Sequence, residues 1–88
     1  MSDFLLQSVF AIGGKTVLMG ELKTGELKTQ MTTIIGDKKC QILDIDAFGK
    51  HSSSFKLEDN KSAVVGLTIS NIPSEEVTKY LNSIIKFQ

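Results

Sequence analysis

Residues 10–28, FAIGGKTVLMGELKTGELK, decide the fold of this chain. The stretch reads as the end of one strand, a reversal at Gly13-Gly14, and a returning strand over residues 16–23. Glycine reaches the positive φ angles that a two-residue reversal requires, so this pair predicts a tight β-hairpin. Gly20 interrupts the returning strand and indicates a bulge or sharp bend of the kind that lets a sheet curl.

Strand-like segments continue on both sides of this hairpin. Their apolar residues alternate with a period of two and include many β-branched side chains, a pattern typical of strands. The expected strands are residues 4–12, 16–23, 31–35, 39–48, 63–69 and 84–87. We expect turns near Gly25 and Gly36, an exposed loop over 49–54 and a turn over 58–61. A short helical turn should begin after Pro73, capped by Ser74, and end near Tyr80.

The 39–48 strand offers two faces. One carries Cys40, Ile42, Asp44, Asp46 and Phe48, and the other carries Gln41, Leu43, Ile45 and Ala47. The second set is the more apolar, so we expect it to face the core. Six short strands with closely spaced turns predict an all-β domain spanning residues 1–88, either a small barrel or a sandwich.

Composition excludes several classes of protein. Ten lysines balance ten acidic residues and arginine is absent, which argues against strong non-specific binding of nucleic acid. A single cysteine, Cys40, allows no internal disulfide, and with one histidine it cannot form a zinc site. These features, with no signal peptide and no apolar run of membrane length, predict a cytoplasmic protein without metal or cofactor.

Three sequence features suggest chemistry, and each has a simpler interpretation. Gly14-Lys15-Thr16 matches the end of a phosphate-binding loop, but Val9 replaces the required glycine and a strand follows, so we expect no nucleotide. His51 lies in the serine-rich loop without an obvious carboxylate partner, and a solvated loop is the expected state. Asp44 and Asp46, about 7 Å apart on one strand face, are expected to face solvent and nearby lysines. No catalytic residue is predicted.

The chain resembles a known family over nearly its whole length. The pattern Phe10-x-Ile12-x-Gly14-Lys15-Thr16-Val17-x-x-Gly20-x-Leu22-x-x-Gly25-x-Leu27-Lys28 is similar to domain 2 of translational GTPases, the elongation factor Tu domain 2 family. Ile45-Asp46-Ala47-Phe48, Val65-Gly66-Leu67 and Ile72 with Glu75-Glu76-Val77 continue the similarity in order. The resemblance implies a closed, antiparallel, six-stranded Greek-key β-barrel with one short C-terminal helical turn, without the GTPase domain.

In that family the barrel helps bind the aminoacylated end of tRNA and contacts the ribosome or the GTPase domain. The resemblance therefore implies a candidate binding site formed by the matching positions Phe10, Ile12, Lys15, Thr16, Val17 and Asp46. Phe10 and Ile12 have an alternative interpretation as core residues. Ser70-Asn71 stands where the family carries arginine and glycine.

Two hypotheses follow for a non-enzymatic, translation-associated binding domain. In the first, it contacts RNA, either the tRNA acceptor end or ribosomal RNA. In the second, it is a protein-interaction module that keeps the barrel without binding RNA and docks on a larger protein partner. The neutral charge and absent arginine favour the second hypothesis, and the resemblance favours the first.

Overall fold

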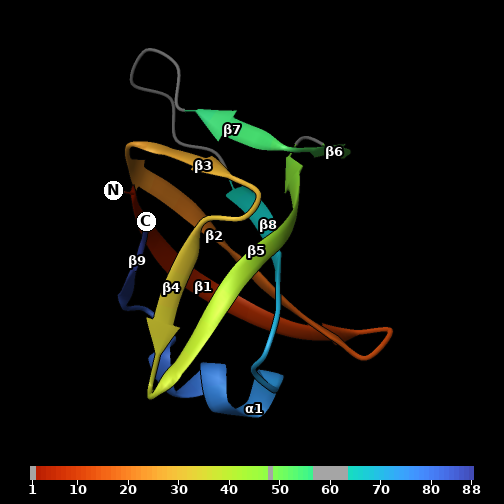
Figure 1. The fold of residues 1–88 in the computed structure, drawn as a ribbon, viewed down its shortest axis with the longest axis vertical. Helices are drawn as coiled ribbons and strands as arrows, with labels where there is room; N and C mark the ends of the chain where they lie inside the picture. Colours follow the sequence, from red (N-terminus) through yellow and green to blue (C-terminus); the bar gives the residue numbers. More distant parts are fainter. Residues whose placement is uncertain (1, 48, 57–63) are drawn as a thin grey trace.

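A small antiparallel β-barrel is the architecture of the computed structural model, which describes residues 2–47, 49–56 and 64–88 (Figure 1). Its elements are, in chain order, β1 (Ser2–Ile12), β2 (Lys15–Thr24), β3 (Glu26–Lys28), β4 (Thr32–Ile35), β5 (Lys38–Ala47), β6 (Lys50–Ser52), β7 (Ser54–Lys56), β8 (Val64–Ile69), α1 (Ser74–Val77), a 3₁₀ turn (Thr78–Tyr80) and β9 (Ile84–Phe87). The six expected strands are therefore confirmed where the structure describes them.

The strands are not joined in simple succession. Around the barrel the order is β4-β5-β8-β2-β1-β9, and β6 adds to β5. Strands β4, β5 and β8 follow one another along the barrel path in chain order, and the earlier β2 lies on the far side of β8, which is a Greek-key arrangement. A separate pair, β3 with β7, lies at one end of the barrel (Figure 1).

The core fills the space inside these strands. Phe4, Phe87 and Leu67 are fully buried, and the two phenylalanine rings meet edge to face with centroids 6.2 Å apart. Strand β8 contributes Val65, Gly66, Leu67 and Ile69 to the buried set, as its continuous apolar run predicted. Burial of apolar surface is the main favourable contribution to the stability of so small a domain.

A bulge in β1 reverses which side chains of the second half of that strand face the core. The pairing with β2 shifts between Leu6 and Ser8, so that Gln7 is an extra residue. Before the shift Phe4 and Leu6 face the core, whereas after it Phe10 and Ile12 face outward and are 49% and 62% exposed. The interpretation of Phe10 and Ile12 as core residues is therefore wrong, because one inserted residue reverses a period-two pattern.

Gly20 lies opposite this bulge, on β2. The expected irregularity is present, but the extra residue belongs to β1 and not to the strand that carries the glycine. A Cβ atom at Gly20 would lie 1.9 Å from the carbonyl oxygen of Leu5, so only glycine lets the two backbones approach this closely. At the hairpin tip, Gly13 and Gly14 have φ angles of 58° and 78°, as the turn prediction required.

A second bulge, in β5, reverses which side chains of that strand face the core. Its pairing with β8 shifts between Ile42 and Asp44. Cys40 and Ile42 are buried before the shift, Ile45 and Ala47 are buried after it, and Leu43 is 47% exposed. The expected core face was thus correct only for the second half of β5, because the register, and with it the inward face, changes at Leu43.

Two local predictions need correction. The stretch 49–54, expected to be a loop, is exposed but contains β6 and the start of β7, which pair with β5 and β3. Ser74 makes no capping hydrogen bond, because Pro73 holds the N-cap position and Ser74 is the first helical residue. The turn at 58–61 and the placement of Phe48 lie outside the described residues.

Candidate binding face

The two bulges bring one set of side chains to the outside of β1, β2, β8, β5 and β6. Register fixes their order across the sheet: Ser8, Met19, Gly66, Asp46 and His51 form one row, and Phe10, Val17, Thr68 and Asp44 form the next. Ile12 and Lys15 pair beyond the second row, at the hairpin tip. We call this surface the outer face. It is defined by Phe10, Ile12, Lys15, Val17, Met19, Gly66, Thr68, Asp44, Asp46 and His51.

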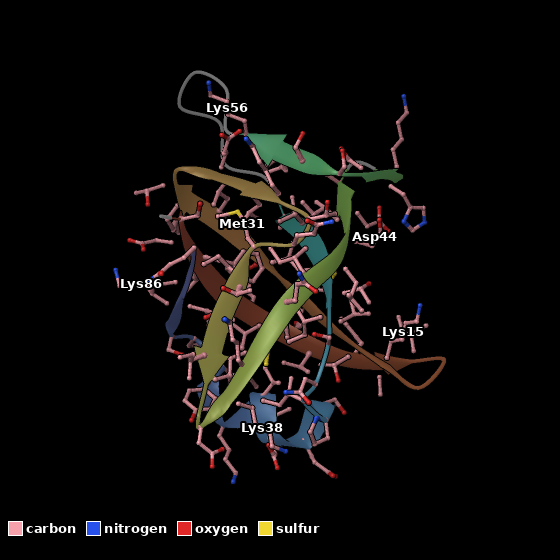
Figure 2. The ribbon with its side chains drawn as sticks, viewed as in Figure 1. Lys15, Met31, Lys38, Asp44, Lys56 and Lys86 are labelled. Carbon is pink, nitrogen blue, oxygen red and sulfur yellow. The ribbon has the colours of Figure 1, made fainter. Side chains whose placement is uncertain are left out.

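One half of the outer face is apolar. Phe10 pairs with the half-buried Val17, and the exposed Ile12 pairs with Lys15, whose ammonium group marks the tip of the hairpin (Figure 2). Directly paired residues of antiparallel strands lie on the same side of the sheet within contact distance. Phe10, Ile12 and Val17 therefore form one exposed apolar strip on a two-stranded support.

Thr16, between Lys15 and Val17 on β2, points the other way. Its side chain is 5% exposed, and its hydroxyl donates a 2.6 Å hydrogen bond to the carbonyl of Ile72. That bond ties the hairpin to the segment before α1 and satisfies a buried polar group. The structure thus gives Thr16 a supporting position beneath the outer face, separate from the exposed candidates.

The other half of the outer face is acidic and contains the single histidine. Nδ1 of His51 lies 2.5 Å from Oδ2 of Asp44, and Asp46 stands directly across the strand pair from His51. Asp44 and Asp46 were expected to face nearby lysines such as Lys38 or Lys39, but Lys38 pairs with Glu76 at 3.1 Å. The partner of Asp44 is His51, because β6 folds back along β5.

Met19 and Gly66 connect the two halves. Gly66 presents no side chain between Met19 on β2 and Asp46 on β5. The sulfur of Met19 occupies this space, since a Cβ at Gly66 would lie 2.9 Å from it. The middle of the outer face therefore has no side chain at Gly66 and is lined by the flexible, polarizable thioether of Met19. Such a side chain adapts to different partner shapes.

His51 titrates above its ordinary range. The hydrogen bond to Asp44 raises its pKa most, followed by the charges of Asp44 and then Asp46. A raised folded-state pKa means that protonated His51 contributes stability below its unfolded pKa. That contribution disappears as the pH rises through the folded value. Above that pH the imidazole is neutral and both carboxylates act as uncompensated charges.

We expect an NMR titration of the His51 ring to give a pKa above 6.5 in the wild-type chain. In Asp44→Asn the same titration should move down toward 6.5, because both the hydrogen-bonded acceptor and its charge are lost. Asp37→Asn is the control, since Asp37 lies in the β4–β5 turn, and it should leave the titration unchanged. An identical His51 pKa in wild type and Asp44→Asn would contradict the ion pair.

Metal binding depends on how closely the titratable side chains of the described residues approach one another. Among them no group of three or more histidine, cysteine, aspartate and glutamate side chains comes close enough to hold a metal ion. Cys40 is fully buried, and this burial raises the pKa of its thiol, which keeps it uncharged and unreactive. The lysines near the hairpin base pair with neighbouring acids, Lys23 with Glu21 at 2.7 Å and Lys28 with Glu26 at 3.5 Å.

The structure assembles four of the six predicted site residues. Phe10, Ile12, Lys15 and Val17 form one exposed group, Asp46 lies on the same face across β8, and Thr16 is directed inward. The sequence interpretation missed the contribution of His51 and Asp44. The one available signal was the glycine at position 49 between them, which permits a hairpin that returns His51 to the acidic strand.

No protein-family model matches the sequence, and no curated protein matches it. In the parts of the chain that the structure describes, none of the helices has the length and apolar character to cross a membrane.

Proposed function

We propose that this chain is a non-enzymatic protein-binding module and that the outer face is its binding surface. The observation that carries the proposal is the exposure of Phe10 and Ile12, at 49% and 62%, on a hairpin held by ladder and buried hydrogen bonds. Large apolar side chains on a rigid surface, and aromatic ones above all, supply most of the energy of protein–protein contacts.

The acidic half supports a protein partner over RNA. Asp44 and Asp46 stand on the same face as Phe10, and a phosphate backbone laid along this surface would meet both carboxylates. Lys15 is the one lysine of the outer face, and the chain has no net positive charge. Because RNA affinity depends on several cations neutralising phosphates, this charge distribution favours a partner that offers an apolar side chain and a cation.

The resemblance to domain 2 of translational GTPases supports placing this partner in the translation apparatus, and hence in the cytoplasm. It also supports the competing RNA hypothesis, in which Phe10 would stack on a base of the tRNA acceptor end or of ribosomal RNA. The two hypotheses predict opposite responses to charge. Removing the carboxylates should lower the affinity for a cationic protein partner and raise the affinity for RNA.

The test is affinity capture by the immobilised chain from a cytoplasmic extract, followed by a Kd measurement with the captured protein. Phe10→Ala combined with Ile12→Ala should weaken the Kd by about tenfold or more. Asp46→Asn should weaken it by a smaller factor that shrinks as salt is added. Leu81→Ala is the matched control, because Leu81 is 40% exposed but lies between the 3₁₀ turn and β9, outside the outer face.

A parallel titration with tRNA and ribosomal RNA fragments at two salt concentrations decides between the hypotheses. RNA binding that strengthens in Asp46→Asn and weakens steeply with salt would overturn the protein-binding proposal. Equal capture of the partner by wild type and by the Phe10→Ala, Ile12→Ala double variant would show that the outer face is not the binding surface.

A further inference from the structure

The barrel wall is open between β4 and β9, the two strands at the ends of the sheet order. At one end, Thr32 and Gln88 exchange two backbone hydrogen bonds of 2.9 and 2.8 Å. The described residues of the two strands make no other backbone bond to each other. Beyond that clasp lies a slot of about 520 Å³, with Ile34 and Ile84 on its sides and the core residues Ile35 and Ile85 at its floor.

Both strand edges direct backbone groups into this slot. Ile35 and Lys38 flank the two-residue β4–β5 turn, so Ile35 and Thr33 bond to β5 while Ile34 presents its N–H and C=O to the other side. Immediately before β9, the carbonyl of Ser83 accepts a hydrogen bond from the N–H of Leu6 on β1. By the same alternation, Lys86 presents its groups to the slot, facing Ile34. Unpaired edges of this kind are templates for another strand.

The side chains around the slot select the chemistry of a ligand. Ile34 is 69% exposed and Ile84 is 46% exposed, and the charged lining residues are Lys39 and Lys86. Lys86 reaches Asp3 at 3.1 Å, and the lining contains no acidic residue among those described. A second copy of the chain would bring lysines against lysines, which disfavours self-association through this edge.

We propose that the slot between β4 and β9 binds an extended acidic segment of a partner protein by strand addition. The segment pairs its backbone with Ile34 and Lys86, places an apolar side chain between Ile34 and Ile84, and directs carboxylates to the two lysines. Main-chain pairing supplies affinity in such complexes, and the pockets for alternate side chains supply specificity.

This site is separate from the outer face. In the barrel order β4 and β9 lie opposite β8 and β2, which carry the centre of the outer face. Figure 2 shows Lys86 and Asp44 on opposite sides of the molecule. The charges also differ, because the charged lining residues of the slot are lysines, whereas the outer face carries the carboxylates of Asp44 and Asp46. A result that contradicts binding at one of the two surfaces therefore leaves the proposal for the other surface unaffected.

The probe is a capped peptide of seven residues with alternating glutamate and valine. On titration into the ¹⁵N-labelled chain, the amide signals of Ile34, Ile84 and Lys86 should shift. Hydrogen exchange at Ile34 and Lys86 should slow by about tenfold or more, because their N–H groups gain partners. The signals of Phe10 and Val17 should stay in place.

Two matched changes test the mechanism. The same peptide with N-methyl groups at its valines lacks half of its backbone donors and should bind at least about tenfold more weakly. Ile34→Glu removes an exposed apolar contact and adds a repelling charge, and it should weaken binding by a similar factor. Leu43→Glu, a change of the same kind at a 47% exposed residue of β5 outside both surfaces, should have no effect.

Each contrary outcome overturns the proposal. If the amide signals of Ile34, Ile84 and Lys86 do not shift at millimolar peptide, the slot is not a peptide-binding site. Equal binding of the N-methylated peptide identifies an apolar pocket without strand addition. Protection of Ile34 and Lys86 that grows with the concentration of the chain alone identifies a second copy as the occupant.

Discussion

Replacing Gly20 with alanine is expected to lower the free energy of unfolding by about 4 kcal/mol. The added Cβ would lie 1.9 Å from the carbonyl oxygen of Leu5 and 3.0 Å from the ring of Phe4. Neither neighbour can retreat freely, because the first is the backbone of β1 beside its bulge and the second is a core side chain. Urea unfolding followed by circular dichroism measures the loss.

The sign of this effect is informative, since alanine in a strand interior is normally more stable than glycine by about 0.5–1 kcal/mol. Gly66→Ala is the matched control. Its Cβ would meet the Met19 sulfur at 2.9 Å, and that flexible side chain can swing away, so we expect a change below about 1 kcal/mol. Equal stability of Gly20→Ala and wild type would show that the strands do not approach this closely.

Phe87→Ala is expected to cost about 4 kcal/mol, because it removes a fully buried ring and leaves a cavity beside Phe4. Domains of this size are stable by only about 4–13 kcal/mol, so the variant should unfold at much lower urea or temperature. Phe10→Ala is the control on an exposed phenylalanine, and we expect it to change stability by less than about 1 kcal/mol.

The edge-to-face contact adds a second measurement. A double-mutant cycle with Phe4→Leu and Phe87→Leu keeps most of the core volume while removing both rings. We expect a coupling energy of about 0.5–1.5 kcal/mol from the ring pair. Strict additivity of the two single changes would contradict the 6.2 Å contact between the rings.

Strand positions were predictable from the sequence because alternation and turn residues are local signals. The Gly13-Gly14 reversal and the buried run of β8 follow from side-chain chemistry within a few residues. Which face of a strand is buried was less predictable. Gln7 and Leu43 are ordinary strand residues, and nothing about them marks an inserted position, yet the register shifts beside each.

These two bulges also explain why the candidate face was only partly predictable. Without the first, Phe10 and Ile12 would follow Phe4 and Leu6 into the core. Without the second, Asp44 and Asp46 would follow Ile42 inward. Both sets reach the outside because a bulge changes the side from which each strand displays its residues. The register that creates each bulge is set by pairing with another strand, β2 for the first bulge and β8 for the second, and is therefore not encoded within the bulged strand itself.

The pairing of β1 with β9 joins residues 2–5 to residues 84–87. Thr32 can form its two backbone hydrogen bonds with Gln88 only after the end of this segment has been synthesised. During synthesis the β1–β2 hairpin can form as soon as it leaves the ribosome, but its outer edge stays unpaired until β9 emerges. The outer edge of the β1–β2 hairpin is therefore exposed from the synthesis of β2 until β9 has followed. An unpaired strand edge is a template for another strand, so we expect this interval to be the one in which the chain is most open to wrong pairing.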